Sequence, residues 1–240
     1  MKSLRESVVK ELLSLNISRL TREFREREKP SERVRPPYVI RLDGVGFGKR
    51  LREFRAPRDE AVHRALVDAA EELMKWFCSP YAYVASDEIN IIVVSEVYAS
   101  RTMKIVSVSA AIASSIVSLR LGKELFFDSR VTELDSVEQA YHYIATRMRI
   151  CFGNLLTTLC RDLGCAGERL ERKIEILRDH RVLDGLEDWM LWGTCIYPES
   201  FVKEAIDRRS SVPIKVFRRR LVECSDPSTC LERVKRLAQF

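Results

Sequence analysis

The stretch YVASDEINIIVV, residues 83 to 94, places two adjacent acids between two runs that otherwise read as buried β-strand. The acids are Asp87 and Glu88, and the runs beside them are rich in the β-branched and aromatic residues that favour strands. Two carboxylates held about 4 Å apart repel by roughly 4 kcal/mol at an effective dielectric near 20. A hairpin with this sequence therefore requires a cation beside the acidic pair, or full solvation of its tip.

The predicted elements around this hairpin follow the order β, α, β, β, α, β. They are a strand at 38–44, a helix at 57–77, strands in YAYVAS and INIIVVS, a helix at 101–122 and a strand within 124–134, followed by a helix from about 136 to 160. The first helix has an apolar face formed by Val62, Leu66, Ala69, Leu73 and Phe77, and Gly122 closes the second. This order is that of a split βαβ unit, so we expect an α+β fold with a ferredoxin-like core.

The ferredoxin-like topology brings three carboxylates to one edge of the sheet. Its first and third strands are central neighbours; Asp43 ends the first, and the third begins just after Asp87 and Glu88. Carboxylate oxygens, with the backbone carbonyl of Gly44 beside them, suit Mg²⁺, and a two-metal site lowers the barrier of phosphoryl or nucleotidyl transfer. Taken singly, Asp-Gly is a common turn and an acidic hairpin tip is often only solvated. Their coincidence at one edge favours the metal site.

The glycines of DGVGFGK, residues 43 to 49, match neither common glycine-loop nucleotide site. Gly48 follows Gly46 by two residues, which breaks the dinucleotide-binding spacing, and Arg50 follows Lys49 where a P-loop needs Ser or Thr. Gly46 and Gly48 are read either as a flexible turn or as a place where backbone approaches phosphate closely.

Length and composition indicate an ordinary globular protein. The 240 residues are 46% hydrophobic, enough for one elaborated domain at 36–200, with a helical N-terminal extension at 1–35 and a basic C-terminal extension at 201–240. The N-terminal segment lacks the apolar core of an export signal. The longest uncharged stretch, 105–119, is too short and too polar to span a bilayer. We expect a cytoplasmic protein with no membrane partner.

The C-terminal extension holds much of the positive charge. Residues 207–240 carry nine Lys and Arg against four Asp and Glu, within a total net charge of +6. Such a segment, with FRRRL at 217–221, suits contact with a polyanion because bound phosphates release counterions. The alternative is a solvated edge strand or helix whose arginines only maintain solubility.

The seven cysteines form no CxxC and lie near no histidine at metal-ligand spacing, so no zinc site is expected. They are read as buried thiols, although Cys224 with Cys230, or Cys160 with Cys165, could pair. The isolated histidines are expected to be structural or exposed; they are His63, His142 and His180.

Several short motifs together resemble one known family. RLDGVGF at 41–47, PRDE at 57–60, SDE at 86–88, RTMK at 101–104 and FDSR at 127–130 are similar, in order and spacing, to the tRNA-histidine guanylyltransferase family, including its Thg-like 3′-to-5′ polymerases. KIEIL at 173–177 and WGT at 192–194 extend the likeness. The resemblance implies a polymerase-palm domain that uses ATP, GTP and two Mg²⁺ ions to add nucleotides to the 5′ end of tRNA, as a homo-oligomer of two or four chains.

The resemblance also implies roles for individual residues. Asp43, Asp87 and Glu88 become the catalytic acids and, with the Gly44 carbonyl, the metal ligands. The implied nucleotide contacts are Val45, Gly46, Phe47, Ser86, Arg101 and Lys104. The implied contacts with RNA or its 5′ end are Arg130, Arg147, Asn154 and Lys173. The alternative for these last residues is a set of surface cations and a helix side chain.

Three departures from the family pattern bear on the substrate. Gly48-Lys49 follows the first motif in place of a histidine and a cation, Phe152-Gly153-Asn154-Leu155 replaces a motif that begins with histidine, and Leu191-Trp192 replaces a basic stretch. Metal chemistry is therefore better supported than recognition of tRNA-histidine, and repair or templated addition at tRNA 5′ ends becomes plausible. The competing functions are a nucleotide cyclase on the same palm and a non-catalytic RNA-binding protein.

Overall fold

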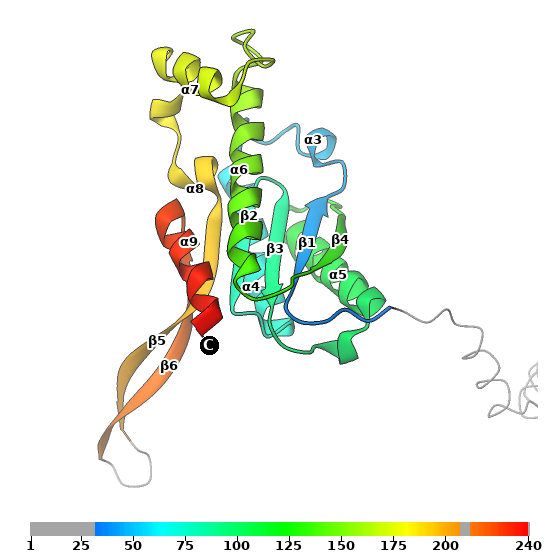
Figure 1. Ribbon diagram of the computed structural model, residues 1–240, viewed down its shortest axis with the longest axis vertical. Coiled ribbons are helices and arrows are strands. Elements are labelled where there is room, and N and C mark those ends of the chain that lie inside the picture. The colour runs from blue at the N-terminus through cyan, green and yellow to red at the C-terminus, as the bar shows by residue number, and fades with distance from the viewer. Residues whose placement is uncertain (1–31, 207–211, 240) are drawn as a thin grey trace, which may run out of the picture. The chain divides into compact units, whose positions relative to one another are not determined.

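A six-stranded sheet with helices on both faces forms the part of the chain that the computed structural model describes, residues 32–206 and 212–239 (Figure 1). Residues 33–240 group as one compact unit. Residues 1–31 of the predicted helical N-terminal extension lie outside the described residues.

The strands are β1 (Tyr38–Gly44), β2 (Tyr81–Ala85), β3 (Glu88–Val93), β4 (Phe127–Glu133), β5 (Thr194–Ile206) and β6 (Pro213–Cys224). The helices are α3 (Phe47–Arg50), α4 (Glu60–Trp76), α5 (Thr102–Leu121), α6 (Gln139–Leu159), α7 (Leu170–Asp179), α8 (Asp188–Trp192) and α9 (Pro227–Lys235). Short 3₁₀ turns span Tyr98–Ser100, Leu183–Gly185 and Arg236–Gln239. Every element predicted between residues 38 and 160 is present within a few residues of its predicted bounds.

The strand order is β4-β1-β3-β2-β5-β6, and every neighbouring pair is antiparallel. The first and third strands are central neighbours, as predicted. In their register Tyr38 lies opposite Val93 at one end and Asp43 lies opposite Glu88 at the other. The acids therefore mark the edge of the sheet where β1 ends and β3 begins.

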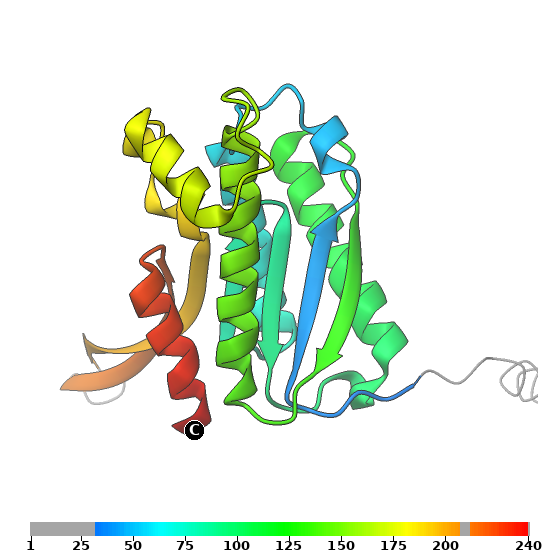
Figure 2. The ribbon, with the colours of Figure 1, turned by 45° about the horizontal axis from the view of Figure 1, so that its top comes forward.

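The two faces of the sheet are covered by different helices (Figure 2). Side chains alternate along a strand, so Ile40 and Leu42 of β1 pack toward α4 and α5, while Val39, and with it Arg41 and Asp43, lies on the face of α6 and α9. This alternation directs the acid at the end of β1 toward α6.

Helices α4 and α5 form where local sequence signals are strongest. The Asp59 side chain caps α4 by accepting hydrogen bonds from the backbone N–H groups of Ala61 and Val62, and the predicted apolar face is buried. Gly122, with φ of 62°, ends α5 in the left-handed conformation. By length and composition alone, α5 is apolar enough to cross a membrane. One face of α5 packs on the core through Ile105.

The sheet continues through the boundary that the sequence placed at residue 200, which falls inside β5. The FRRRL segment belongs to β6 and not to a helix. Its register sets Arg218 opposite Phe201 and Arg220 opposite Glu199, so these two arginines share one face and Arg219 lies on the other.

Four cysteines form disulfides, and only one of these pairs was considered from the sequence. Cys160 bonds to Cys165, as anticipated, but Cys230 bonds to Cys195 and not to Cys224. The reading of the cysteines as buried thiols is therefore wrong for the four that are bonded, and of the two alternative pairings only Cys160 with Cys165 is formed. Cys195 lies at the start of β5, where the long-range pairing of β5 with its neighbours brings it under α9.

Candidate active site

The three acids predicted to converge lie at one edge of the sheet. Asp43 is the register partner of Glu88 in β3, and the backbone N–H of Gly44 donates to the carbonyl of Asp87 at 3.1 Å. Gly44 leaves no room for a side chain, because a Cβ there would lie 2.4 Å from the ring of Phe47. The close approach of this loop to the hairpin turn is thus built into the sequence.

Electrostatic strain is concentrated on Asp43. Burial raises the pKa of its carboxyl above the usual 3.8, and the charges of Asp87 and Glu88 raise it further, against the opposing effect of Arg41. None of the ion pairs formed by the described residues involves Asp43 or Asp87. A bound cation would relieve this repulsion.

Glu88 has a different environment from the other two acids. It is only 3% exposed, and Arg147 of α6 holds both of its carboxylate oxygens, with Nε donating to Oε1 at 2.8 Å. The amide of Asn90 donates to Oε1 at 2.7 Å, and Arg41 Nε lies 4.0 Å from Oε2. Glu88 is thus already neutralised by the protein, so Asp43 and Asp87 are the more available ligands.

A fourth carboxylate, Asp128, joins this edge, and the sequence reasoning did not select it. Asp128 is the register partner of Asp43 in β4, and its charge contributes to the raised pKa of Asp43. Its Oδ2 pairs with Arg130 Nη2 at 3.2 Å, but its Oδ1 is buried without a hydrogen-bond partner among the described residues. An orphaned buried carboxylate oxygen is costly unless something binds it. The signal was present in FDSR, because the predicted strand placed this acid beside the first.

These donors fit a hard divalent cation. Carboxylate and carbonyl oxygens at one sheet edge, with no nitrogen or sulfur ligand among them, match the preference of Mg²⁺. The unpaired acids and the orphaned oxygen of Asp128 supply the negative charge that such an ion needs.

A cavity of about 430 Å³ opens beside the hairpin turn. Its walls include Ser86 and Asp87 from the turn, Phe47 and Gly48 from α3, and the loop from residue 51 to 59. This loop contributes Arg52, Arg55 and Arg58. The volume falls within the range of about 300–1,000 Å³ found for ligand pockets.

The far wall of this cavity is aromatic. His63 stacks on Trp189 with ring centroids 4.5 Å apart, and its Nε2 hydrogen-bonds with the Thr194 hydroxyl at 2.8 Å. Burial, together with the charges of Arg58 and Arg64, lowers the pKa of His63 to about 4. The ring is neutral at neutral pH, which agrees with the structural role expected for this histidine. Nothing in the residues around His63 indicated that it would border a cavity.

Four of the predicted nucleotide contacts lie near the acids. Val45, Gly46 and Phe47 follow β1 directly, and Ser86 precedes Asp87 in the hairpin turn. Gly46 has φ of 68°, a left-handed conformation that a residue with a side chain adopts only with strain. Phe47 is buried against Phe127, so it supports the loop from within.

Arg101 and Lys104 do not join this group within the chain. They start α5 as predicted, but β3 runs away from the hairpin turn, and Arg101 bridges to Arg33 near the beginning of β1. The length of β1, at about 3.3 Å per residue, separates this end of the sheet from Asp43 by roughly 17 Å. Within a single chain the two cations therefore lie at the opposite end of β1 from the acids, and their contact with a nucleotide stays a prediction.

The four predicted RNA contacts lie in three different environments: two line a cavity, one is on the surface of α6 and one is buried. Arg130 and Arg147 line a second cavity, of about 510 Å³, together with Arg41 and His142 on the α6 face of the sheet. Asn154 is exposed on α6, two turns beyond Arg147. Lys173 instead is buried, and its amine donates to the Thr157 hydroxyl at 2.8 Å, which joins α7 to α6.

Comparisons with known proteins agree with one another. A family model described as tRNAHis guanylyltransferase matches residues 19–142. A bacterial tRNA(His) guanylyltransferase-like protein in complex with ATP is 18% identical, with a TM-score of 0.72, covering 94% of this chain and all of the other. A structure of such a bacterial protein in complex with GTP is 17% identical, with a TM-score of 0.69, over 92% and 99% of the two chains. The tRNA(His) guanylyltransferase of Saccharomyces cerevisiae is 19% identical, with a TM-score of 0.62, over 72% and 91%. No curated protein matches the sequence at a significant level.

Proposed function

The chain belongs to the tRNAHis guanylyltransferase family, and from this membership we propose that it is a magnesium-dependent nucleotidyltransferase acting on the 5′ end of tRNA. It adds nucleotides in the 3′-to-5′ direction, prefers GTP, and uses ATP to activate a 5′-monophosphate. The observation that carries the proposal is the sheet edge where Asp43 lies opposite Asp128 and the adjoining hairpin turn supplies Asp87, which lines a cavity of suitable size for a nucleotide.

The acids are assigned the role of holding two Mg²⁺ ions. Asp43, Asp87 and the Gly44 carbonyl are the primary ligands, and the orphaned oxygen of Asp128 is a further one. Bound there, the ions would supply Lewis-acid chemistry: they would lower the pKa of the attacking hydroxyl and neutralise charge on the leaving group, which is pyrophosphate when the 5′-monophosphate attacks ATP and AMP when the 3′-hydroxyl of GTP attacks the adenylylated end. Glu88, already neutralised by Arg147, is assigned a supporting role in which this pairing fixes α6 against the acids.

The cavity beside Asp87 is assigned to the nucleotide. Arg52 and Arg55 have exposed side chains on its wall and offer positive charge to a triphosphate. Arg58 is held in place by donating to the carbonyls of Met190 and Cys151. The neutral His63–Trp189 stack leaves the remaining wall suitable for the flat surface of a base.

The second cavity is assigned to the 5′ phosphate of the RNA. Arg41, Arg130 and Arg147 surround it, and guanidinium groups bind phosphate in bidentate fashion. It shares Arg147 with the acidic edge, so an RNA end bound there would lie next to the reacting groups. Asn154 and the cations of β6 are candidates for contacts further along the RNA.

The core is proposed to be a ferredoxin-like polymerase palm working as a homo-oligomer. The order of strands and helices, β1-α4-β2-β3-α5-β4, and the spatial order β4-β1-β3-β2 support the palm. Arg101 and Lys104 lie far from the acids of their own chain. Any triphosphate that they contact is therefore assigned to the active site of another copy of the chain, which supports the homo-oligomer.

One assay tests the function directly. Purified protein, Mg²⁺, ATP and labelled GTP are incubated with intact 5′-monophosphorylated tRNAs and with tRNAs shortened at the 5′ end, and the labelled end is mapped by nuclease digestion. Label at the 5′ end of RNA supports the proposal. Formation of a cyclic nucleotide without RNA, or tRNA binding with no incorporation under any condition, would replace it with one of the competing functions.

A further inference from the structure

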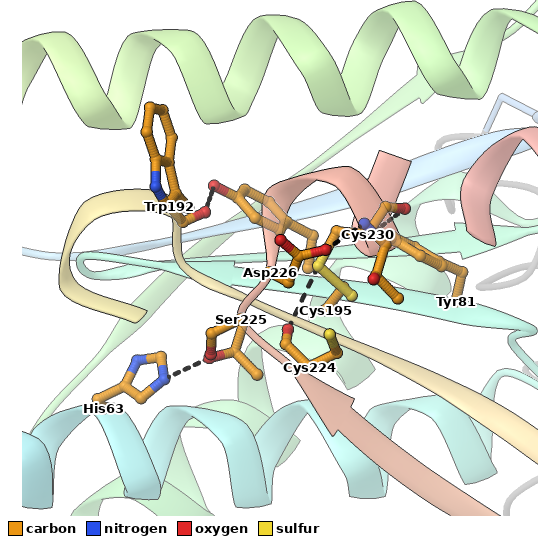
Figure 3. Close-up of a disulfide and its surroundings, with 11 residues drawn as sticks. His63, Tyr81, Trp192, Cys195, Cys224, Ser225, Asp226 and Cys230 are labelled. Carbon is orange, nitrogen blue, oxygen red and sulfur yellow. Dashed lines mark hydrogen bonds between the residues drawn. A yellow bond between two sulfur atoms is a disulfide. The ribbon is translucent and has the colours of Figure 1, made fainter. Parts of the chain in front are cut away.

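Three cysteines from three different elements meet where β5, β6 and α9 come together (Figure 3). Cys195 lies in β5, Cys224 is the last residue of β6, and Cys230 lies in α9. Their sulfur atoms all lie within 4.8 Å of one another. Cys195 is bonded to Cys230, and Cys224 is a free thiol.

Cys195 has a second partner within reach besides Cys230. Cys195 and Cys224 face each other in the antiparallel pairing of β5 with β6, so their side chains lie on the same face of the sheet. Directly opposed residues have Cα atoms about 4.5–5.5 Å apart, which lies inside the range of about 4.4–6.8 Å that a disulfide spans. A bond from Cys195 to Cys224 therefore requires no shift of the strands.

The cluster is better suited to thiol chemistry than to a metal. Structural zinc sites use four protein ligands, and within the described residues the cluster holds no fourth His, Cys, Asp or Glu at the same radius. Two of its three sulfurs are already bonded to each other. The carboxylate of nearby Asp226 is engaged in capping α9, where it accepts from the Thr229 N–H at 2.7 Å.

We propose that Cys224 exchanges with Cys230 for the bond to Cys195, so that the cluster is an intramolecular disulfide switch. The Cys224 thiol loses its proton and its sulfur forms a bond to Cys195 Sγ. The Cys195–Cys230 bond breaks, and Cys230 leaves as a thiolate that takes up a proton. One disulfide and one thiol are present before and after, so the step needs no oxidant or reductant.

The equilibrium ratio of the two disulfide isomers is set by packing in the folded protein and not by the lengths of the loops that the two bonds close. The existing bond spans 35 residues, and a Cys195–Cys224 bond would span 29. Loop-closure entropy varies as three halves of the logarithm of loop length, so the two loops differ by only about 1.3-fold in ease of closure. Packing of α9 therefore determines which isomer predominates.

The exchange has a structural consequence for α9. In the Cys195–Cys230 isomer, a covalent bond ties α9 to the sheet; Arg233 lies 4.4 Å from the ring centre of Tyr197 in β5, and Lys235 lies 4.4 Å from that of Tyr141 in α6. In the other isomer, α9 is held only by packing and hydrogen bonds, such as that from the Tyr81 hydroxyl to the Cys230 carbonyl. The switch thus controls how firmly these cations are positioned.

Disulfide mapping of the full-length protein tests the proposal. The protein is purified without reductant, incubated, quenched with acid, alkylated and digested without reduction for mass spectrometry. Trypsin alone leaves Cys224 and Cys230 on one peptide, because no Lys or Arg lies between residues 220 and 233, so a protease that cuts before Asp226 is added. We expect both Cys195–Cys230 and Cys195–Cys224 links in the wild-type protein, with Cys195–Cys230 predominant because the packing of α9 favours it and Cys195–Cys224 present as a detectable minor link.

Variants sharpen the result. Cys224→Ser should show only the Cys195–Cys230 link, and Cys230→Ser, whose Cys195 and Cys224 are both thiols, should form the Cys195–Cys224 link when oxidised glutathione is supplied. Cys78→Ser, which removes an exposed free thiol elsewhere, should leave the isomer ratio unchanged. Wild-type protein that contains only Cys195–Cys230 would overturn the proposal, whether or not Cys230→Ser folds. A ratio that depends on Cys78 or on protein concentration would also overturn it, because the exchange would then be intermolecular.

Discussion

Removal of Arg147 should strongly destabilise the protein, because it leaves the buried carboxylate of Glu88 without its main ion-pair partner. Glu88 and Arg147 side chains are 5% and 17% exposed, and the guanidinium supplies two hydrogen bonds to Glu88. Breaking a buried pair from one side costs about 3–5 kcal/mol. Arg41 remains 4.0 Å from Glu88 and Asn90 still donates, so Arg147→Met should lower the free energy of unfolding by about 3 kcal/mol, the low end of that range.

Urea denaturation followed by circular dichroism, in metal-free buffer, measures this loss. The expected shift of the midpoint is about 1 M for an m-value of 2–3 kcal/mol/M. The double variant Glu88→Gln/Arg147→Met should recover much of the loss, since no buried charge is left unpaired. Arg172→Met, which breaks an exposed pair with Glu175, is the matched control and should not shift the midpoint measurably. A double variant no more stable than Arg147→Met would refute the reasoning.

Three further outcomes follow from the same geometry. Asp43→Asn should raise the melting temperature of the metal-free protein at neutral pH, because the raised pKa of Asp43 means that its charged form destabilises the fold. The difference from the wild-type protein should vanish as the pH falls below about 4, where Asp43 is protonated in both the folded and the unfolded state. An unchanged or lowered melting temperature at neutral pH would contradict this. Asp128→Asn should weaken the apparent Mg²⁺ affinity in the nucleotide-addition assay by about tenfold or more, while Asp135→Asn should not; equal Mg²⁺ titrations for both would remove Asp128 from the site. Arg218→Ala should reduce the slope of log tRNA affinity against log salt concentration by about one unit, and Arg220→Ala should reduce it by less, because Arg220 is already paired with Glu199. Binding curves that superimpose on the parent at every salt concentration would exclude β6 from the RNA surface.

The first half of the fold could be predicted because its signals are local. Alternation of apolar residues defined β1, β2 and β3, and the apolar face of α4 was visible at helical spacing. The end of α5 at Gly122 likewise needed only neighbouring residues. The convergence of Asp43 with the hairpin acids then followed from topology, since the order of elements determines which strand ends share an edge.

What failed depended on contacts distant in sequence. The partner of Glu88 is 59 residues away on α6, and nothing in the hairpin indicated that Arg147 would neutralise it. The pairing of Cys195 with Cys230 required the register of β5 and β6. The position of Lys104 follows from the topology: β3 runs away from the hairpin turn, so the start of α5 lies at the opposite end of the strands from the hairpin acids.

The assignment of the acids rests on comparing nucleotide addition by wild-type protein with that of Asp43→Asn and Asp87→Asn. Each variant is first shown to be folded by circular dichroism and to bind tRNA like the parent. Labelled GTP incorporated at the 5′ end of tRNA is then measured over a range of Mg²⁺ concentrations. The wild-type protein is expected to incorporate label only with the metal, and both variants are expected to remain at background even at saturating Mg²⁺. Incorporation by either variant at the wild-type rate would contradict the assignment of this sheet edge as the site of catalysis.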